Sequence, residues 1–566
     1  MNESMRDHVL KSRYLLSGEH TFLDLCRRVA DAIGREDDER EAYFEMMNNL
    51  EFLPNSPTLM NAGTACNQLA ACFVIPIGST IAEIFEAVRQ GAIIQITGGG
   101  TGYNFSAIPP EGSELGSAGG KSPGPVRFME IFDTSTEVIR QGGRRRGANM
   151  GILDVAHPDI LSFITAKHEE GVLTNFNLSV MIPDSFMEAI QRGADETILF
   201  THRITEKSVT VGEVFGAIVE GIYRNGEPGV LFSDTINHGN KTPRLGTITA
   251  TNPCGEEPLL PFESCILGSI NLTRFIRDGA VEWRRLGETV RLAVHFLNTA
   301  IDRTSHPLPE IREATLRTRK IGIGVMGLHD ALLLSGLPYD SEDARRFAER
   351  VIAFITQMAV DESQKIADET GPFPAWEGSS WKEPIRNAAL TTIAPTGTIS
   401  LIAGCSSGIE PVYSFVITRH HTAGASFEVI HPLFSEQLDS EIADLGYHGA
   451  DAEAKRMEVI EEVFRSESLQ RIDWLSPAFR RLYRSATEIS IHDHLLMQAT
   501  FQQHIHASIS KTINIREDIG RDEIREALLL GWRLRLKGVT LYRKESRKEI
   551  IFRSKGCAGC RDTSIE

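Results

Sequence analysis

NPCGEEPLLPFESCILGSINL, at residues 252–272, is the stretch of this sequence that decides its fold and its chemistry. It opens with a carboxamide, a thiol and a carboxyl at alternate positions, Asn252, Cys254 and Glu256. Because alternate residues of an extended segment or an open loop point the same way, the three side chains can face one small volume. This layout suits radical or proton chemistry at a thiol, and it indicates an enzyme rather than a binding module.

Cys254 has a simpler alternative role, that of a buried structural cysteine in a turn fixed by Pro253 and Gly255. The flanking side chains argue against this alternative. A carboxyl at position 256 can relay a proton, and a carboxamide at position 252 can hold a hydroxyl group without ionising. We therefore expect Cys254 to be a reactive thiol.

Two further cysteines, Cys72 and Cys265, each border a short apolar run that is typical of a strand. Such a pair can meet in a folded core and supply two electrons by forming a disulfide. Two unrelated buried thiols explain the same pattern equally well. Three other cysteines are expected to be structural: Cys26, Cys66 and Cys405.

Cys557 and Cys560 form a CxxC motif in a charged tail that begins after about residue 546. This spacing lowers the pKa of a thiol and favours reversible oxidation. A flexible tail would let the pair visit a site and then meet an external reductant. Half of a zinc site is the alternative, although no second CxxC or histidine pair lies nearby.

Length and composition exclude several classes of protein. The chain has 566 residues and a formal net charge of −17, which argues against a general nucleic-acid scaffold. It contains no apolar run of about 18 residues, so we expect no membrane span. The first residues do not form a signal peptide, and eight cysteines are too few for a secreted disulfide framework. We expect a cytoplasmic protein.

The apolar pattern alternates between helices and short buried strands. Residues 20–50 are expected to be helical, and residues 54–130 are expected to be buried strands joined by loops that line a site. A helix is predicted to start at Ser341. Further strands are expected at residues 178–182, 321–326, 389–394 and 538–542. Alternation of this kind argues for an α/β barrel or a wound sheet.

Two glycine-rich segments and one arginine cluster are candidates for binding phosphate groups. Residues 394–400, APTGTIS, follow an apolar run, and their backbone N–H groups could cradle a phosphate, although an ordinary strand-to-helix turn explains them equally well. The glycines of residues 98–102 allow close approach of a ligand. The Arg144–Arg146 loop suits nucleotide phosphates, with a solvated basic turn as its alternative.

Several cofactor motifs are absent. The sequence has no CxxxCxxC for a radical-generating iron–sulfur cluster, no glycyl-radical segment near its end, no DxHxxG and no HExxH or di-iron pattern. We therefore expect no metal held by protein side chains, and the sequence does not identify residues that contact a cofactor.

Taken together, these segments resemble the catalytic subunit of ribonucleotide reductases, most closely the class II form that depends on adenosylcobalamin. The resemblance spans nearly the whole chain, in the order of the family. It is carried by LPNSPTLMNAG (53–63), ACFV (71–74), GGRRRGANM (142–150), residues 252–272, APTGTISLIAGCSSGIEPVY (394–413) and HDHLLMQATFQ (492–502).

The resemblance implies a ten-stranded α/β barrel made of two antiparallel halves, each of five parallel strands. A finger loop through the middle would carry Cys254 at its tip. The implied division is a helical N-terminal region at 1–50 without an ATP-cone, a barrel at 51–546 and a flexible redox tail at 547–566.

The implied reaction is reduction of ribonucleotides, taken to be diphosphates, to 2′-deoxyribonucleotides for DNA synthesis. Cys254 would form the thiyl radical that abstracts the 3′-hydrogen of the substrate. Glu256 would act as base at the 3′-hydroxyl, and Asn252 would hold the ribose hydroxyls. Cys72 and Cys265 would be the redox pair. Cys557 and Cys560 would re-reduce that pair and be reduced by thioredoxin or glutaredoxin.

The resemblance also implies where nucleotides bind. Residues Pro395, Thr396, Gly397, Thr398 and Ile399 would hold the substrate diphosphate. The same pocket would be lined by Ser56, Ala71, Cys72, Gly100 and residues 252–256, which include Pro253 and Gly255. The Arg144–Arg146 loop would link dNTP or ATP effectors at a homodimer interface to the choice of base.

Class II is favoured over class I because GVTLYRKESRK, at residues 538–548, lacks the adjacent tyrosine pair through which a class I subunit receives its radical. A class I large subunit that needs a separate radical-generating protein remains one alternative. A non-catalytic dNTP-binding paralogue is the other, although the retained cysteines, Asn252 and Glu256 argue against it. Ile266 departs from the asparagine common after the second redox cysteine, a change that we expect to be tolerated.

Overall fold

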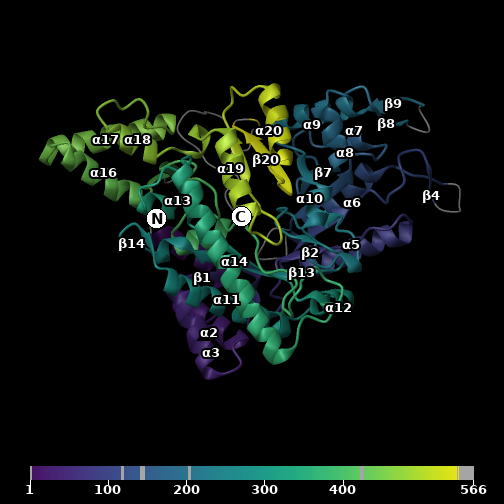
Figure 1. Cartoon of the computed structure of the whole chain (residues 1–566), viewed down its shortest axis with the longest axis horizontal. Coiled ribbons are helices and arrows are strands. Elements are labelled where there is room, and N and C mark those ends of the chain that lie inside the picture. Colours follow the sequence, from purple (N-terminus) through teal and green to yellow (C-terminus); the bar gives the residue numbers. More distant parts are fainter. Residues whose placement is uncertain are drawn as a thin grey trace.

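The computed structural model describes residues 3–115, 120–140, 147–201, 206–420, 426–544 and 546. The chain begins with a helical layer, as expected for residues 20–50. Its elements are α1 (Glu3–Val9), the π-helical turn Leu10–Tyr14, α2 (Phe22–Ile33) and α3 (Asp37–Asn48). Thr21 caps α2 through a reciprocal pair of hydrogen bonds with Asp24, and the apolar stripe of α2 is buried. Figure 1 shows α2 and α3 together at one tip of the molecule.

Two sets of parallel strands form the barrel. The first set runs in the order β2 (Cys72–Val74), β3 (Gly100–Asn104), β6 (Asn149–Asp154), β7 (Phe176–Ile182) and β10 (Gly229–Phe232). The second set contains β13 (Ser264–Asn271), β16 (Ile321–Met326), β19 (Thr512–Ile515) and β20 (Gly538–Arg543). Parallel bridges from Ile323 to Thr391 and from Ile393 to Ile509 insert residues 391–393 as the fifth member.

Antiparallel pairing joins the two sets at both seams. β13 pairs with β2, and β20 pairs with β10. The strands therefore close into a ring of ten, which confirms the predicted barrel of two antiparallel halves. A short strand, β1 (Phe52–Pro54), adds to the same edge of β13.

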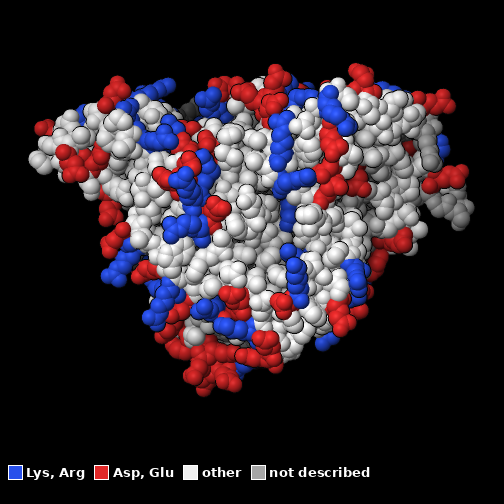
Figure 2. Space-filling model, in the orientation of Figure 1, with Lys and Arg blue, Asp and Glu red and all other residues white. Residues whose placement is uncertain are grey.

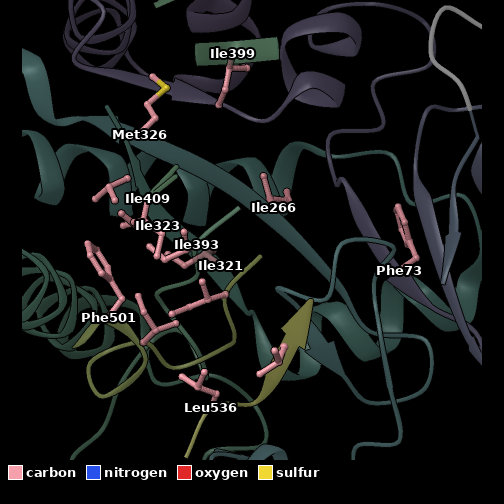
Figure 3. Packing of buried hydrophobic residues seen from close by; sticks show 14 of the residues in the cluster. Phe73, Ile266, Ile321, Ile323, Met326, Ile393, Ile399, Ile409, Phe501 and Leu536 are labelled. Atoms are coloured by element: carbon pink, nitrogen blue, oxygen red, sulfur yellow. The ribbon is translucent and has the colours of Figure 1, made fainter. Parts of the chain in front are cut away.

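Alternation along the strands separates the inside of the barrel from the outside. On β13, Cys265 and Leu267 belong to the inner apolar cluster, whereas Ile266 and Ile270 belong to the large outer core. Figure 3 shows Ile321 and Ile323 of that outer core gathered with Ile393. The glycine between them, Gly322, faces inward, because a Cβ atom there would meet Leu267 and Thr392.

A hairpin fills the centre of the barrel. Its arms are β11 (Ala250–Thr251) and β12 (Pro258–Leu259), which pair antiparallel. The hairpin passes so close to β3 that a Cβ atom at Gly102 would lie 1.6 Å from the carbonyl oxygen of Thr251. Only glycine fits at this position. The arrangement is the finger loop that we expected, with residues 252–257 at its tip.

The prediction of strands and loops for residues 54–130 is wrong in part. The structure has β2 and β3 there, but also α4 (Ser56–Asn61), α5 (Ile81–Gln95) and the start of α6 (Pro125–Arg140). The start of α5 carries a recognisable signal, since Thr80 and Glu83 form a capping box. The apolar residues of α5 obscured it because they occur in short runs that also fit buried strands.

Helices cover the outside of the barrel. Figure 1 shows α11, α14 and α19 crossing in front of it. The predicted helix after Ser341 is confirmed as α14, with the Ser341 side chain as its cap. The covering helices are α7 (Ile160–Thr165), α8 (Asp184–Gln191), α9 (Val211–Asn225), α10 (Ser233–His238), α11 (Trp283–Arg303), α12 (Pro309–Thr318), α13 (Leu328–Leu334), α14 (Glu342–Thr370), α15 (Gly397–Ala403), α19 (Ile491–Gln502) and α20 (Arg521–Arg533).

A lobe with its own apolar core projects from one side of the barrel (Figure 1). It contains α16 (Pro432–Asp444), α17 (Gly449–Ser466) and α18 (Pro477–Leu482). Minor hairpins complete the fold: β4 (Glu114–Leu115) with β5 (Gly120–Lys121), β8 (Ile198–Thr201) with β9 (Ser208–Thr210), β14 (Ile276–Arg277) with β15 (Ala280–Val281) and β17 (Val416–His420) with β18 (Ser426–Ile430). Short 3₁₀ turns lie at Pro243–Leu245, Leu272–Phe275 and Ala486–Glu488.

The surface carries charges of both signs. Figure 2 shows acidic side chains gathered at the tip formed by α2 and α3, where the first turn of α3 contributes Asp37, Asp38 and Glu39. Within the described ranges, none of the helices is long and apolar enough to cross a lipid bilayer.

Candidate active site

A cavity of about 240 Å³ opens beside the tip of the finger loop. The first barrel half contributes residues at the start of β2 and β3, and the second half contributes residues after the bridged segment 391–393. Thirteen of the predicted site residues line it: Ser56, Ala71, Cys72, Gly100, Asn252, Pro253, Cys254, Glu256, Pro395, Thr396, Gly397, Thr398 and Ile399. The chain thus brings together segments that lie far apart in the sequence.

The finger tip is held in shape by its own backbone and by Asn252. The backbone N–H of Asn252 donates to the carbonyl of Glu257 (3.2 Å), and the N–H of Gly255 donates to the carbonyl of Asn252 (3.1 Å). The N–H of Glu257 donates to Oδ1 of Asn252 (2.9 Å). Gly255 has φ +80°, which glycine adopts without strain. It gives the tip its turn and is not among the residues that line the cavity.

The three reactive side chains differ in exposure. Cys254 is exposed at the tip, whereas Asn252 and Glu256 are buried, at 2% and 3% exposed. A thiol that faces the cavity between two shielded polar groups can exchange a hydrogen atom with a ligand, while its neighbours hold and deprotonate hydroxyl groups. The predicted alternative of a buried structural cysteine is wrong, because Cys254 is exposed.

Cys72 and Cys265 meet across the seam of the barrel. They are directly opposed residues of the antiparallel strands β2 and β13, which is the arrangement in which cross-strand side chains come closest. Cys72 lines the cavity and Cys265 does not. Both are reduced thiols, and the side-chain amide of Asn252 donates to Sγ of Cys72 (3.1 Å). The structure therefore brings together the two cysteines whose meeting the sequence left open, and their role as a redox pair stays a prediction.

Burial sets the acidity of Cys265. Desolvation, followed by the charge of Glu257, raises the pKa of the Cys265 thiol well above its ordinary value. Burial and the charge of Glu256 likewise raise the pKa of Glu257 to about 8. The inner sulfur of the pair therefore lies in a site that disfavours a thiolate.

Residues 394–399 form a strand-to-helix turn whose helix starts at the cavity. Thr396 has φ +56° and its Oγ1 accepts a hydrogen bond from the N–H of Gly408 (2.7 Å), which fixes the turn. Gly397 is the first residue of α15, and a Cβ atom there would meet no other group within 4 Å. The free backbone N–H groups at such a helix start attract anions. The predicted strand-to-helix turn is confirmed, and the phosphate cradle stays a prediction.

Several lining residues were not predicted from the sequence. They are Asn55, Pro57, Ala148, Leu267, Gly268 and Ser269, whereas Gly98, Gly99 and Ala394 belong to the two predicted glycine-rich segments. Strand alternation could have predicted two of them. Leu267 and Ser269 follow Cys265 at alternate positions of one strand, so they share its inward face. Asn55 caps α4 through Oδ1, which hid its place beside the cavity.

Three predicted elements lie outside the described residues: the arginines of the Arg144–Arg146 loop, Cys557 and Cys560. Across the part of the chain that the structure describes, no cluster of three or more His, Cys, Asp and Glu side chains is arranged to hold a metal ion.

Comparison with known proteins places this geometry in a family. The family model described as ribonucleotide reductase, barrel domain, matches residues 70–385 and 382–542, and the all-alpha domain of the same family matches residues 5–67. A vitamin B12-dependent ribonucleoside-diphosphate reductase of Thermoplasma acidophilum is 43% identical over 513 residues, which cover 89% of this chain and 65% of that protein. The chain thus spans less than two thirds of that relative.

A second relative and a solved structure support the same family assignment. A vitamin B12-dependent ribonucleoside-diphosphate reductase of Mycobacterium tuberculosis (strain CDC 1551) is 42% identical over 565 residues, covering 96% of this chain and 80% of that protein. The alpha subunit of the Actinobacillus ureae class Id ribonucleotide reductase has the same fold, with a TM-score of 0.80 at 22% identity over 96% of this chain and 97% of that one. The chain belongs to the ribonucleotide reductase family.

Proposed function

We propose that this chain reduces ribonucleotides, as diphosphates, to 2′-deoxyribonucleotides through a thiyl radical at Cys254, with adenosylcobalamin as the radical source. The proposal rests on the arrangement of side chains at the tip of the finger loop. It places an exposed thiol between a buried carboxamide and a buried carboxyl, in the same cavity as one thiol of an opposed cysteine pair. The names of the two relatives at 42–43% identity support the diphosphate substrate and the cofactor.

Adenosylcobalamin, when bound, supplies the one-electron chemistry that removes a hydrogen atom from a thiol. The structure fits that requirement, because Cys254 is exposed and adjoins an open cavity. Cys254 is the residue that would meet the cofactor. The described residues contain no carboxylate–histidine cluster that would make an alternative radical centre within this chain.

Different residues of the chain act on different parts of the substrate. The start of α15 holds the diphosphate through its backbone N–H groups. Asn252 holds the ribose hydroxyls, and Glu256 takes the proton of the 3′-hydroxyl while Cys254 removes the 3′-hydrogen. The 2′-hydroxyl then leaves as water. Cys72 and Cys265 give up two electrons and two hydrogens and become a disulfide, so the substrate gains what the pair loses.

Cys72 is the thiol of the pair that faces the substrate, since it lines the cavity and Cys265 does not. Re-reduction is proposed to come from the CxxC pair Cys557 and Cys560, which thioredoxin or glutaredoxin would reduce. The proposed division of the chain is accordingly a helical region (1–50), a barrel (51–546) and a redox tail (547–566). The cysteines of the described residues are reduced, which suits a reducing compartment such as the cytoplasm.

A homodimer is part of the proposal. α5 and α6 pack together and expose apolar side chains at Ile81, Phe85 and Val138, with Ile96 at the end of α5. Exposed apolar residues on adjacent helices are typical of a subunit interface. Phe85→Glu should shift the protein from dimer to monomer in light-scattering chromatography. Leu23→Glu, a change at a similarly exposed leucine on α2, should leave the dimer intact.

The function is tested by reduction of CDP with dithiothreitol and an effector nucleotide, with and without adenosylcobalamin. The proposal requires turnover that depends strictly on the cofactor and disappears in Cys254→Ala, while nucleotide binding to that variant persists. Turnover by Cys254→Ala would exclude the thiyl radical at this position. Activity that needs a separate iron or manganese protein would move the chain to class I.

A further inference from the structure

Glu257 is a buried carboxyl that faces away from the substrate. It follows Glu256 in the chain, is 1% exposed and is not among the residues that line the substrate cavity. It lines a second cavity of about 20 Å³, together with Lys320, Lys537 and His506. Oε1 of Glu257 accepts no hydrogen bond from the described residues.

The structure makes room for this carboxyl. A Cβ atom at Gly322 would lie 2.9 Å from Oε1 of Glu257 and even closer to Leu267 and Thr392. The glycine in β16 therefore opens the space between the wall of the barrel and the finger loop. The backbone of Glu257 is fixed by its hydrogen bonds with Asn252, so the carboxyl has a defined position.

Glu257 and the inner thiol of the pair act on each other's pKa. The charge of Glu257 and a side-chain hydrogen bond with it raise the pKa of Cys265, and the same hydrogen bond lowers the pKa of Glu257. Cys265 is 1% exposed and is shut off from the substrate cavity. Its other acceptor is the carbonyl of Ile266, at the long distance of 3.9 Å. Glu257 thus lines the second cavity and also acts on the Cys265 thiol.

The groups around Glu257 keep a proton available near neutral pH. Its pKa is raised to about 8 by burial and by Glu256, against the opposing charge of Lys320, which itself forms a 2.6 Å ion pair with Glu263. Burial and Lys241 lower the pKa of Lys537 to about 7. Burial lowers the pKa of His506 to about 3, so that ring is neutral.

We propose that Glu257 donates the proton that Cys265 requires when the Cys72–Cys265 disulfide is reduced, and that the lysine-lined cavity returns a proton to Glu257. The inference rests on the proposed function and deepens it. It assigns a role in the regeneration of the enzyme to a residue that does not touch the substrate.

Reduction of the disulfide proceeds through a mixed disulfide at Cys72. The thiolate of an external dithiol attacks the accessible sulfur of Cys72, the S–S bond breaks, and its electron pair stays on Cys265 as a thiolate. The carboxyl of Glu257 gives its proton to this thiolate, which becomes a thiol, and Glu257 becomes a carboxylate. The second thiolate of the reductant displaces Cys72, which takes its proton through the substrate cavity. Water in the second cavity reprotonates Glu257.

The test uses the full-length protein with the pair oxidised chemically, in the absence of substrate and cofactor. Release of the Cys72 and Cys265 thiols by dithiothreitol is followed from pH 6 to 9 by alkylation and mass spectrometry, and the rate is divided by the thiolate concentration. In the unaltered protein this corrected rate should fall above a pH of about 8. Glu257→Gln should be slower at neutral pH by on the order of tenfold and should lose the inflection. Glu257→Asp should recover part of the rate.

Glu256→Gln is the matched variant, because it changes the neighbouring carboxyl on the substrate side. Its inflection should move to lower pH, because a charge that raises the pKa of Glu257 is gone. An unchanged rate and inflection in Glu257→Gln would overturn the proposal. If Glu257→Gln fails to fold, the test rests on Glu256→Gln. A pH inflection in Glu256→Gln at the same pH as in the unaltered protein would then overturn the proposal. Failure to reduce CDP leaves this measurement unaffected and counts only against the proposed function.

Discussion

The side-chain amide of Asn252 donates a hydrogen bond to Sγ of Cys72 across the barrel, at 3.1 Å. The same carboxamide accepts the backbone N–H of Glu257 at 2.9 Å. One buried side chain therefore connects the finger loop to the cavity-facing thiol of the opposed cysteine pair. Removal of this side chain would change both the shape of the loop and the electrostatics of Cys72.

Asn252→Asp separates these two effects. The aspartate keeps an oxygen that can accept the N–H of Glu257, but it replaces the amide donor with a negatively charged oxygen. We expect the pKa of Cys72 to rise, because the thiolate loses a donor and gains a like charge nearby. The rate of alkylation of Cys72 against pH, followed by mass spectrometry, measures this. An unchanged alkylation profile would mean that the contact has no influence on the thiol.

Gly102 should tolerate no side chain. A Cβ atom there would stand 1.6 Å from the carbonyl oxygen of Thr251, which is backbone and cannot move without displacing the finger loop. We expect Gly102→Ala to destabilise the fold by about 3 kcal/mol or more and to abolish turnover. Thermal unfolding and CDP reduction are the measurements.

Gly216→Ala is the control for this substitution. Gly216 lies inside α9, and a Cβ atom there meets nothing within 4 Å. Alanine in place of glycine in a helix interior is worth up to about 1 kcal/mol, so this variant should be at least as stable as the unaltered protein. Equal stability of the two variants would show that the finger loop can shift to accept a side chain.

The parts of the site that follow from local pattern were accessible from the sequence. Alternation places Asn252, Cys254 and Glu256 together, and the glycines of residues 394–400 mark a turn before a helix. The opposition of Cys72 and Cys265 was left open, because no local rule sets the register of strands so far apart in the chain. The contact of Glu257 with Cys265 was missed, because it depends on the inward position of Gly322 in a third strand.

Substitution of Gly397 tests whether the start of α15 binds the diphosphate of the substrate. It is the first residue of α15, and its missing side chain leaves the helix start open to the cavity. Gly397→Ala should leave thermal stability unchanged or slightly higher, since alanine favours the helix. It should raise the KM for CDP several-fold while changing kcat less, because the added methyl group obstructs the ligand and not the reacting atoms. A KM that does not change would place the diphosphate elsewhere.

The raised pKa of Glu257 predicts how the free energy of unfolding depends on pH. Its pKa is about 8 in the folded protein, above the ordinary value of 4.5, so the folded state holds a proton that the unfolded state has released between these pH values. The free energy of unfolding that this group contributes therefore falls as pH rises from about 4.5 to about 8, and it is constant outside that window. Glu257→Gln does not titrate. The thermal midpoint of the variant, minus that of the unaltered protein, should become more positive from pH 5 to pH 8. A difference that is constant across this range would show that Glu257 is already ionised in the folded protein at pH 5, and that it holds no proton to give to Cys265.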